Sequence, residues 1–362
     1  MKNLIVGCGL AGATMARLLA ERGEAVTVID ARDHIAGNIY DYMHDGVCVH
    51  KYGPHAFHTS DKSVWDFLGR FCTWYPYHHR VLAHVDGMVV PVPFNLNSLH
   101  MVFPDALANR LEQKLLDNYG FNVKVPILEL RKSSDTDLLF LAEYIYEKIF
   151  LGYTLKQWGM RPDEIDPTVS GRVPVYISRD NRYFQDTYQG VPIGGYTKMI
   201  ERMLSHPNIT VKLNTPFSRD MPYDRLFWSG SIDEFFEFKH GTLPYRSERF
   251  DILTFPFEKF QSGAQVNYPC NYDFTRITEF KYFLNDQSDK TVVSYEYPVE
   301  FIPGQNDRYY PIANPDTAAL YQKYLDMARD MPNVYFFGRL GDYKYYNMDQ
   351  VVSRTIALFN SL

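Results

Sequence analysis

The chain has 362 residues, of which 46% are hydrophobic and 22% charged. This length and composition are typical of a globular protein with two or three domains and exclude a disordered or fibrous chain. A formal net charge of −6 argues against nonspecific nucleic-acid binding. The four cysteines form no C-x-x-C pair, which argues against a zinc site or a disulfide framework. We therefore expect no metal and no nucleic-acid partner.

The first residues carry no pattern typical of export. The apolar run at residues 4–6 breaks at once into glycines, whereas a signal peptide needs a longer apolar stretch and a cleavage site. About 18 consecutive apolar residues, the length of a membrane-spanning helix, occur nowhere. We expect a cytoplasmic protein with no membrane span.

The chain begins with a pattern typical of a β-α-β unit. Residues 3–6 predict a buried strand, and after a glycine turn residues 13–22 predict a helix that ends at Gly23. Residues 25–29 predict a second strand, and Asp30 stands at its end. These elements predict a Rossmann-type fold.

The turn between this strand and helix has the spacing G-x-G-x-x-G at Gly7, Gly9 and Gly12. The first glycine would make the turn, the second would admit a pyrophosphate, and the third would let the helix pack on the strand. The helix N-terminus would attract the phosphates, and Asp30 would accept hydrogen bonds from ribose hydroxyls. These residues predict a dinucleotide site without deciding between FAD and NAD. A second glycine turn at residues 31–38, with Gly338-Arg339, fits a molecule longer than one nucleotide.

The later elements alternate between helical and strand patterns. A hairpin is predicted around Asp86-Gly87, and Asn97 is expected to cap the helix that follows it. The middle of the chain predicts helices and then an antiparallel sheet, before strands return to the first domain and a last helix ends the chain. The ranges are 81–92 for the hairpin, 98–118 and 137–150 for helices, 170–190 and 243–302 for the sheet, 209–213 and 226–228 for the returning strands, and 350–358 for the last helix.

The predicted fold class is α/β, with a discontinuous Rossmann-type domain for FAD or NAD, a helical insertion and an antiparallel β-sheet substrate domain. The expected ranges are 1–80, 190–240 and 305–362 for the Rossmann-type domain, 95–160 for the helical insertion with a mobile loop, and 161–189 and 241–304 for the substrate domain.

Several longer motifs are more specific than the glycine turn. They are H-I-A-G-N at 34–38, H-K-Y-G-P-H-A-F-H at 50–58, G-Y-T-L-K-Q-W at 152–158, Y-Q-G-V-P-I-G-G-Y at 188–196, and G-R-L-G-D-Y-K-Y-Y-N-M-D at 338–349. Together and in this order, the sequence resembles bacterial UDP-galactopyranose mutase over nearly its whole length.

The resemblance implies a flavoenzyme that isomerises UDP-galactopyranose to UDP-galactofuranose for cell-wall polysaccharide. In this family reduced FAD uses its N5 to displace UDP, which gives a covalent flavin–sugar intermediate, and the sugar ring opens and recloses with no net redox change. An external reductant such as NAD(P)H need only prime the flavin. The family also implies a homodimer.

The resemblance assigns roles to individual residues. His58 would lie against the flavin, and Arg172 and Arg276 would grip the substrate diphosphate, where charge builds as UDP departs. Expected substrate contacts are Phe150, Tyr153, Thr154, Trp158, Tyr183, Asn267, Tyr310, Tyr345 and Asn347. Expected cofactor contacts are Gly7, Gly9, Leu10, Ala11, Gly12, Asp30, Arg32, Gly37, Asn38, His55, His58, Arg339, Tyr346 and Met348.

Two residues depart from the family pattern. Ala36 stands where a glycine is usual, and one methyl group is tolerated there if the residue has a negative φ. Asn347 stands where many members carry Asp, which removes a negative charge near the diphosphate and leaves the sugar open, with UDP-N-acetylgalactosamine as an alternative. Gly159 and Pro162 are expected to bound a hinge, and residues 161–180 to carry a closing lid.

Two other classes of protein share part of this pattern. A flavin-dependent oxidase or desaturase would share residues 7–30, but its substrate cleft should be chiefly apolar. A nucleotide sensor or scaffold would need the nucleotide site but not the combination of His58, Arg172, Arg276 and Tyr310. The two arginines and the tyrosines favour the isomerase.

Overall fold

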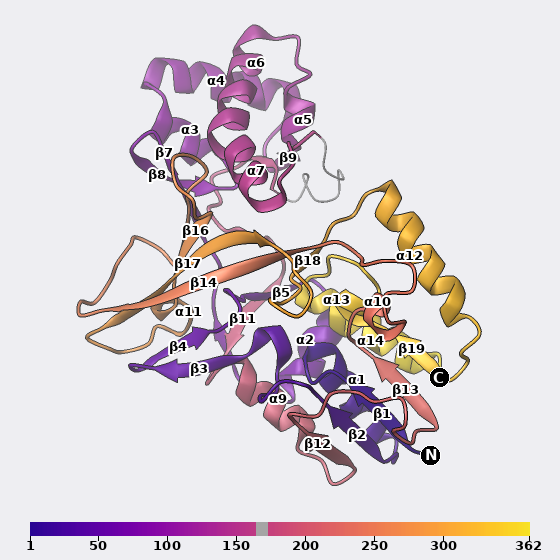
Figure 1. Ribbon diagram of the computed structural model, residues 1–362. Coiled ribbons are helices and arrows are strands. Elements are labelled where there is room, and N and C mark those ends of the chain that lie inside the picture. Colours follow the sequence, from indigo (N-terminus) through magenta and orange to yellow (C-terminus); the bar gives the residue numbers. More distant parts are fainter. Residues whose placement is uncertain (164–172) are drawn as a thin grey trace. The chain divides into compact units, whose positions relative to one another are not determined.

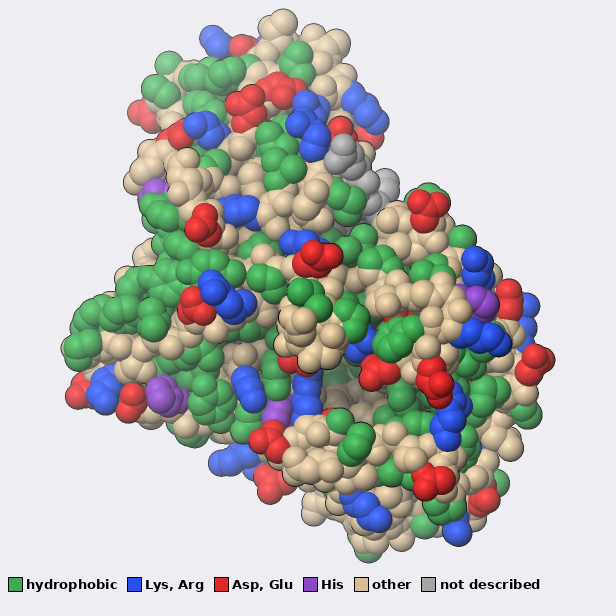
Figure 2. Space-filling model, viewed as in Figure 1, with side chains coloured by type: hydrophobic (Ala, Val, Ile, Leu, Met, Phe, Trp, Pro, Cys, Tyr) green, Lys and Arg blue, Asp and Glu red, His purple; other side chains and the backbone are tan. Residues whose placement is uncertain are grey.

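The computed structural model describes residues 1–163 and 173–362. The chain forms two compact units: unit 1 comprises Met1–Tyr77, Asp186–Tyr245 and Phe301–Leu362, and unit 2 comprises His78–Gln185 and Arg246–Glu300. Basic and acidic side chains are interspersed over the visible face (Figure 2). Within the described ranges, no helix is both long and apolar enough to cross a membrane.

A five-stranded parallel sheet forms the centre of unit 1 (Figure 1). Its order is β12-β2-β1-β13-β19, with every neighbouring pair parallel. The strands are β1 (Asn3–Val6), β2 (Val26–Ile29), β12 (Ile209–Lys212), β13 (Arg225–Trp228) and β19 (Val334–Phe336). The carboxyl ends of parallel strands lie at one edge of a sheet, which is where open α/β folds bind ligands.

Helix α1 (Leu10–Glu21) follows β1 and packs against α14 (Met348–Asn360) and α9 (Tyr196–Leu204). Ala13, Ala16 and Ala20 are buried, and such small side chains allow the close packing that the glycine motif requires. The other elements of unit 1 are η1 (Gly37–Ile39), β3 (Asp41–His44), β4 (Val47–His50), β5 (Phe57–Thr59), α2 (Lys62–Gly69), β6 (Trp74–Pro76), β11 (Tyr188–Pro192), α10 (Ile232–Phe235), β18 (Tyr310–Pro311), α12 (Pro315–Ala328) and α13 (Gly338–Gly341).

Unit 2 contains a long sheet in the order β14-β17-β16-β15-β7-β8, antiparallel except between β15 and β7. Its strands are β14 (Tyr245–Phe255), β17 (Thr291–Glu300), β16 (Arg276–Glu279), β15 (Gln265–Asn267), β7 (Val81–Val85) and β8 (Met88–Val92). A short pair, β9 (Val123–Val125) with β10 (Val175–Ile177), lies apart from it.

The helical part of unit 2 shares one apolar core with the β7–β8 hairpin. Buried residues of the hairpin, including Val81 and Val90, pack with buried leucines of the helices, including Leu111 and Leu141. The helices are α3 (Leu96–Val102), α4 (Asp105–Tyr119), α5 (Ile127–Leu130), α6 (Thr136–Ile145), η2 (Tyr146–Leu151), α7 (Gly152–Trp158) and α11 (Lys281–Leu284).

Three local expectations differ from the structure. Asn95 caps α3 by accepting from the N–H groups of Asn97 and Ser98, so the cap is two residues earlier than expected. The range 98–118 is two helices rather than one, because Pro104 disfavours helical backbone at the residue before it. The range 170–190 does not add strands to the long sheet as expected. Within it, β10 pairs with β9, and residues 178–187 form no strand.

Candidate active site

A cavity of about 560 Å³ opens in unit 1 beside the carboxyl ends of the parallel strands. This volume is within the usual range for a ligand site. Its lining includes most of the cofactor residues expected from the sequence. They are Gly7, Gly9, Leu10, Ala11, Asp30, Arg32, Gly37, Asn38, His55, Arg339 and Met348.

The glycine turn shows why each glycine is needed. A Cβ atom at Gly12 would lie 1.9 Å from the carbonyl oxygen of Gly7, so this glycine allows α1 to pack on β1 and lies outside the cavity lining. At Gly9 a Cβ atom would lie 3.6 Å from the Gly37 Cα, an ordinary contact. Gly9 therefore leaves open the room at the N-terminus of α1 that a phosphate group would occupy.

Asp30 ends β2 and is held by backbone groups. Its carboxylate accepts hydrogen bonds from the N–H of Cys8 at 2.7 Å and of Arg32 at 3.0 Å. A carboxylate has about four acceptor sites, so this arrangement leaves capacity for ribose hydroxyls. The carboxylate thus links the glycine turn to the start of the second turn.

Arg32 joins three segments at the wall of the same cavity. Its guanidinium donates to Asn38 Oδ1 at 2.9 Å and to Asp307 Oδ1 at 2.7 Å, and it lies 4.6 Å from the centre of the Tyr52 ring. Burial opposes the charge, but Asp307 and neighbouring groups outweigh it and raise the Arg32 pKa. Arg32 is thus a fixed cation at the cavity wall.

The chain at Ala36 corrects one sequence expectation. Its φ is +72°, so the condition of a negative φ does not hold, and Ala36 is an alanine in left-handed backbone. The N–H of Ala36 donates to the carbonyl of Cys8, which fixes this conformation against the glycine turn. Gly37 follows with φ +53°, and its Cβ would lie only 2.9 Å from the Gly9 Cα.

The C-terminal motif supplies Arg339 to the cavity and places tyrosines near it. The Arg339 guanidinium donates to the backbone carbonyls of Tyr309 at 3.4 Å and Tyr346 at 2.7 Å. It lies within 5.8 Å of the ring centres of Tyr310 and Tyr345, and these two rings meet edge to face. Arg339, Tyr345 and Tyr346 of this motif therefore lie close together, although Tyr346 does not line the cavity.

Asn347 has a structural function that the sequence did not reveal. It begins α14 in a capping box with Gln350, whose Oε1 accepts from the Asn347 N–H at 2.9 Å. Asn and Asp are equally good residues at a helix N-cap. The presence of Asn instead of Asp at position 347 can therefore be explained without a difference in substrate.

His58 lies on β5 and is oriented by Asp186, which the sequence analysis missed. The His58 Nδ1 atom lies 2.8 Å from Asp186 Oδ2, and Ser60 donates to the other carboxylate oxygen at 3.0 Å. An ionised carboxylate only accepts hydrogen bonds, so Nδ1 carries the proton and the ring orientation is set. The two residues are 128 positions apart, and no local motif connects them.

Other missed residues line the cavity at the ends of β12 and β13. They follow the same rule that places ligands at the carboxyl ends of parallel strands, which is the signal that could have found them. They are Thr215, Pro216 and Phe217 after β12, and Ser229 and Gly230 after β13.

In unit 2, the strand register places Arg276 between a predicted substrate contact and a buried carboxylate. Asn267 is its neighbour on β15, and Glu296 is its neighbour on β17. Arg276 Nε donates to Glu296 Oε2 at 2.5 Å, while the side chain remains 17% exposed. The guanidinium is thus anchored at one end and accessible.

A second carboxylate lies beside this pair. Glu248 is 3% exposed, its Oε2 lies 3.9 Å from Arg276 Nη2, and it shares a hydrogen bond with Glu296. Gln157 Nε2 donates to Glu248 Oε1 at 2.7 Å, and Thr278 Oγ1 donates to Glu296 Oε1 at 2.8 Å. Burial and the Glu296 carboxylate, opposed by Arg276, raise the pKa of Glu248 to about 7.

Tyr153 belongs to the same group of side chains. Burial raises the pKa of its phenol, and the charges that act on it are those of Arg276, Glu248 and Glu296, with Tyr183 also close. The phenol therefore stays protonated and can donate a hydrogen bond to an anion. Tyr153 thus lies close to Arg276 on one side and to Tyr183 on the other.

The G-Y-T-L-K-Q-W motif forms α7 and is held by contacts within unit 2. A Cβ atom at Gly152 would lie 2.3 Å from the Pro269 carbonyl oxygen, so a glycine is required there. Lys156 Nζ donates to the carbonyls of Tyr268, Tyr272 and Phe274. These contacts fix α7 against the loop that precedes Arg276.

The remaining substrate predictions are placed differently. Phe150 is 8% exposed and packs in the apolar core of unit 2. Thr154 and Trp158 are half-buried on α7, and Gly159 ends that helix in left-handed backbone at φ +70°. Arg172 and residues 164–172 of the predicted lid lie outside the described residues.

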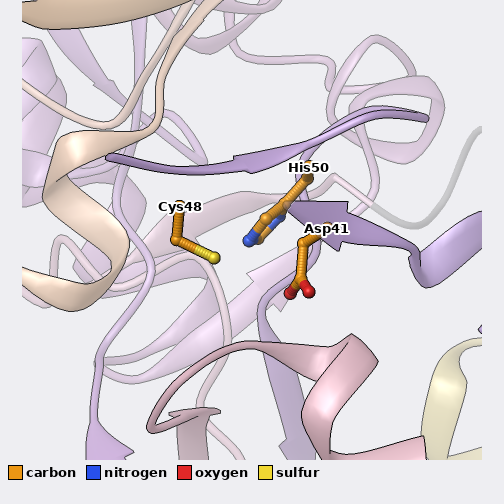
Figure 3. Close-up of side chains that lie close together, drawn as sticks. All are labelled: Asp41, Cys48 and His50. Atoms are coloured by element: carbon orange, nitrogen blue, oxygen red, sulfur yellow. The ribbon is translucent and has the colours of Figure 1, made fainter. Parts of the chain in front are cut away.

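Asp41, Cys48 and His50 form a buried cluster in unit 1 whose ligand-type atoms all lie within 4.8 Å of one another (Figure 3). Asp41 accepts hydrogen bonds from the N–H groups of Tyr196 and Thr197 and from the Cys48 thiol. Burial lowers the His50 pKa to about 3, so its ring is neutral.

The tautomer of His50 decides what this cluster does. Its Nδ1 accepts from the N–H of His55 at 3.0 Å, so the single ring proton lies on Nε2, where it prevents metal coordination. Asp41 instead caps α9 from a distant segment. Gly195 is required there, because its Cβ would lie 2.7 Å from the Asp41 carboxylate.

The parallel sheet, the glycine turn and the acidic end of β2 define a dinucleotide-binding Rossmann protein, and an NAD(P)-binding Rossmann-like domain matches residues 5–71. The UDP-galactopyranose mutase domain matches residues 148–345. The chain belongs to the UDP-galactopyranose mutase family, which is an enzyme family.

Three curated relatives match along almost the whole chain. A Klebsiella pneumoniae protein named "Probable UDP-galactopyranose mutase" is 39% identical over 98% of this chain and 93% of its own. An Escherichia coli dTDP-fucopyranose mutase is 36% identical over 98% and 96%. A Mycoplasma pneumoniae UDP-galactopyranose mutase is 30% identical over 98% and 94%.

Solved structures show the same fold at low sequence identity. A reduced UDP-galactopyranose mutase matches with a TM-score of 0.71 at 15% identity, covering 100% of this chain and 96% of that one. A redesigned putrescine oxidase matches with a TM-score of 0.60 at 11% identity, covering 99% and 98%. The fold class predicted from the sequence is confirmed, but the fold alone does not separate a mutase from an oxidase.

Proposed function

We propose that this chain is a flavin-dependent isomerase that converts UDP-galactopyranose to UDP-galactofuranose with no net redox change. The observation that carries the proposal is the Arg276 guanidinium, anchored by Glu296 and set beside the phenol of Tyr153, which has Tyr183 close to it. A cation among hydroxyl donors suits a diphosphate, and an oxidase with an apolar substrate has no need of it.

Family membership and the residues at the cavity in unit 1 support FAD as the cofactor. The N-terminus of α1 at Gly9 would receive the pyrophosphate, Asp30 would bind ribose hydroxyls, and Arg32 and Arg339 would add positive charge. When bound and reduced, for instance by NAD(P)H, FAD would supply the nucleophilic N5 that captures the anomeric carbon of the sugar as a covalent intermediate.

The residues of the chain bind, orient and stabilise charge in this proposal. Arg276 stabilises the negative charge that grows on the departing UDP, and Arg172 is proposed to act with it. The Tyr153 hydroxyl donates a hydrogen bond without adding charge. Asp186 fixes the His58 ring through Nδ1, which would leave Nε2 as the nitrogen available to the flavin.

The test uses protein reduced with dithionite under anaerobic conditions. Incubation with UDP-galactofuranose should give UDP-galactopyranose, separated by chromatography, with neither oxygen uptake nor hydrogen peroxide. UDP-N-acetylgalactofuranose and dTDP-fucofuranose are run in parallel, since a dTDP-fucopyranose mutase is among the relatives. Conversion of only one of these two would move the proposal to that substrate, and peroxide formation without any isomer would favour the oxidase.

A further inference from the structure

Two buried carboxylates in unit 2 lie beside Arg276, and this imbalance of charge is the starting point, since Arg246, the other arginine near Glu248, also faces Glu300. Glu248 and Glu296 are 3% and 1% exposed, and Arg276 is the cation beside both. Two adjacent buried carboxylates cannot both ionise without a large cost, and they titrate as a pair that shares one proton. A proton between them leaves one negative charge, which Arg276 balances.

We propose that Glu248 is a positioning residue that shares one proton with Glu296, so that loss of this proton weakens the binding of a nucleoside diphosphate sugar at Arg276. The identity of the ligand rests on the proposed function, whereas the shared proton does not. With the proton present, Glu248, Glu296 and Arg276 together are neutral before the substrate arrives. Without it, these three residues carry a net negative charge, which meets the two negative charges of the diphosphate.

The register of the sheet makes this contact specific. Phe250 is the direct neighbour of Glu296 across the β14–β17 pair, and Glu248, two residues earlier, lies on the same face. Gln157 on α7 holds the far oxygen of Glu248 at 2.7 Å. The carboxylate is thus fixed from two elements and directed at the pair formed by Glu296 and Arg276.

The groups around Glu248 identify which of them titrates near neutral pH. On β16 and β17 these are Arg276 and Glu296, on β14 Arg246, and on α7 Tyr153, with Tyr183 near it. The arginines stay charged and the phenols stay neutral between pH 6 and pH 8.5. The rise in the Glu248 pKa agrees with its being the group that loses a proton in this range.

The experiment measures the dissociation constant of UDP-galactose for the flavin-loaded protein by titration calorimetry between pH 6 and pH 8.5. UDP-galactose is suited because its diphosphate carries the same charge across this range. The wild-type constant should rise by about tenfold above pH 7, as expected for one added charge near the ligand. Glu248→Gln keeps both hydrogen-bonding positions without the charge, so its constant should match the wild-type value at pH 6 and stay flat.

Two further measurements separate this effect from structural damage. Glu258→Gln removes one exposed charge from the same unit and should leave the wild-type pH profile unchanged. Infrared difference spectra between pH 6 and pH 8.5 should show a protonated carboxyl band that Glu248→Gln lacks. A flat wild-type profile, or a Glu248→Gln profile that still rises, would overturn the proposal. If no variant binds UDP-galactose at any pH, the proposed function fails instead, and the infrared band alone then decides whether the proton is shared.

Discussion

Replacing Gly9 by valine should distinguish the effect of this residue on protein stability from its effect on cofactor binding. Gly9 has φ −80° and ψ −169°, an extended conformation open to any residue. Its Cβ would meet Gly37 Cα at 3.6 Å, so the protein has room for the first carbon. The free energy of unfolding of cofactor-free protein should fall by less than about 1 kcal/mol.

The effect on FAD should be much larger. A branched side chain at Gly9 occupies the space through which a pyrophosphate would approach the N-terminus of α1. Losing one or two hydrogen bonds to a charged group costs about 1.5–3 kcal/mol each, which corresponds to a dissociation constant weaker by at least about tenfold to hundredfold. Flavin fluorescence titration of the cofactor-free protein measures this loss, and thermal unfolding of the same sample measures stability.

Gly12→Ala provides the matched comparison. Its Cβ would lie 1.9 Å from the Gly7 carbonyl oxygen, a backbone atom that cannot move aside cheaply. This variant should lose stability and flavin together, whereas Gly9→Val should lose flavin alone. A Gly9→Val protein that retains a full complement of yellow flavin would refute the assignment of this turn to the pyrophosphate.

Three further outcomes are expected. Arg276→Lys should retain FAD but lower kcat/KM by at least about tenfold, because a lysine cannot reproduce the anchored guanidinium fork; an equal loss of flavin and turnover would contradict its assignment to the substrate. Asn347→Asp should keep the α14 cap and change the free energy of unfolding by less than about 0.5 kcal/mol. It should raise KM for the UDP-sugar if this side chain lies near the diphosphate, and an unchanged KM would mean that the residue serves only as the helix cap. The raised pKa of Glu248 means that the folded state holds a proton which the unfolded state releases near pH 4.5, so stability falls from about pH 4.5 to pH 7. The free energy of unfolding of Glu248→Gln, measured relative to wild type by denaturant unfolding, should therefore be about 2 kcal/mol higher at pH 8.5 than at pH 5. An equal difference from wild type at both pH values would contradict this.

The glycine motif, the first β-α-β unit and the hairpin at residues 81–92 could be predicted because local sequence determines them. Turns, caps and hydrophobic periodicity act over a few residues. Asp30 was found for the same reason, since it stands at the end of the second strand of a recognisable unit.

The missed contacts of Glu248 and Asp41 join residues that are distant in sequence. Glu248 meets Gln157 across 91 positions, and Asp41 caps α9 across 155. Neither residue has a neighbouring pattern that distinguishes it from a surface acid. Only the pairing of β14 with β17 shows that Glu248 is buried beside Glu296.

The turnover of UDP-galactofuranose by anaerobic, dithionite-reduced protein tests the central claim most directly. The account predicts rapid formation of UDP-galactopyranose by reduced protein, much slower conversion by oxidised protein, and a flavin that remains reduced after many turnovers. A reduced, flavin-loaded protein that binds UDP-galactofuranose but forms no UDP-galactopyranose would contradict it.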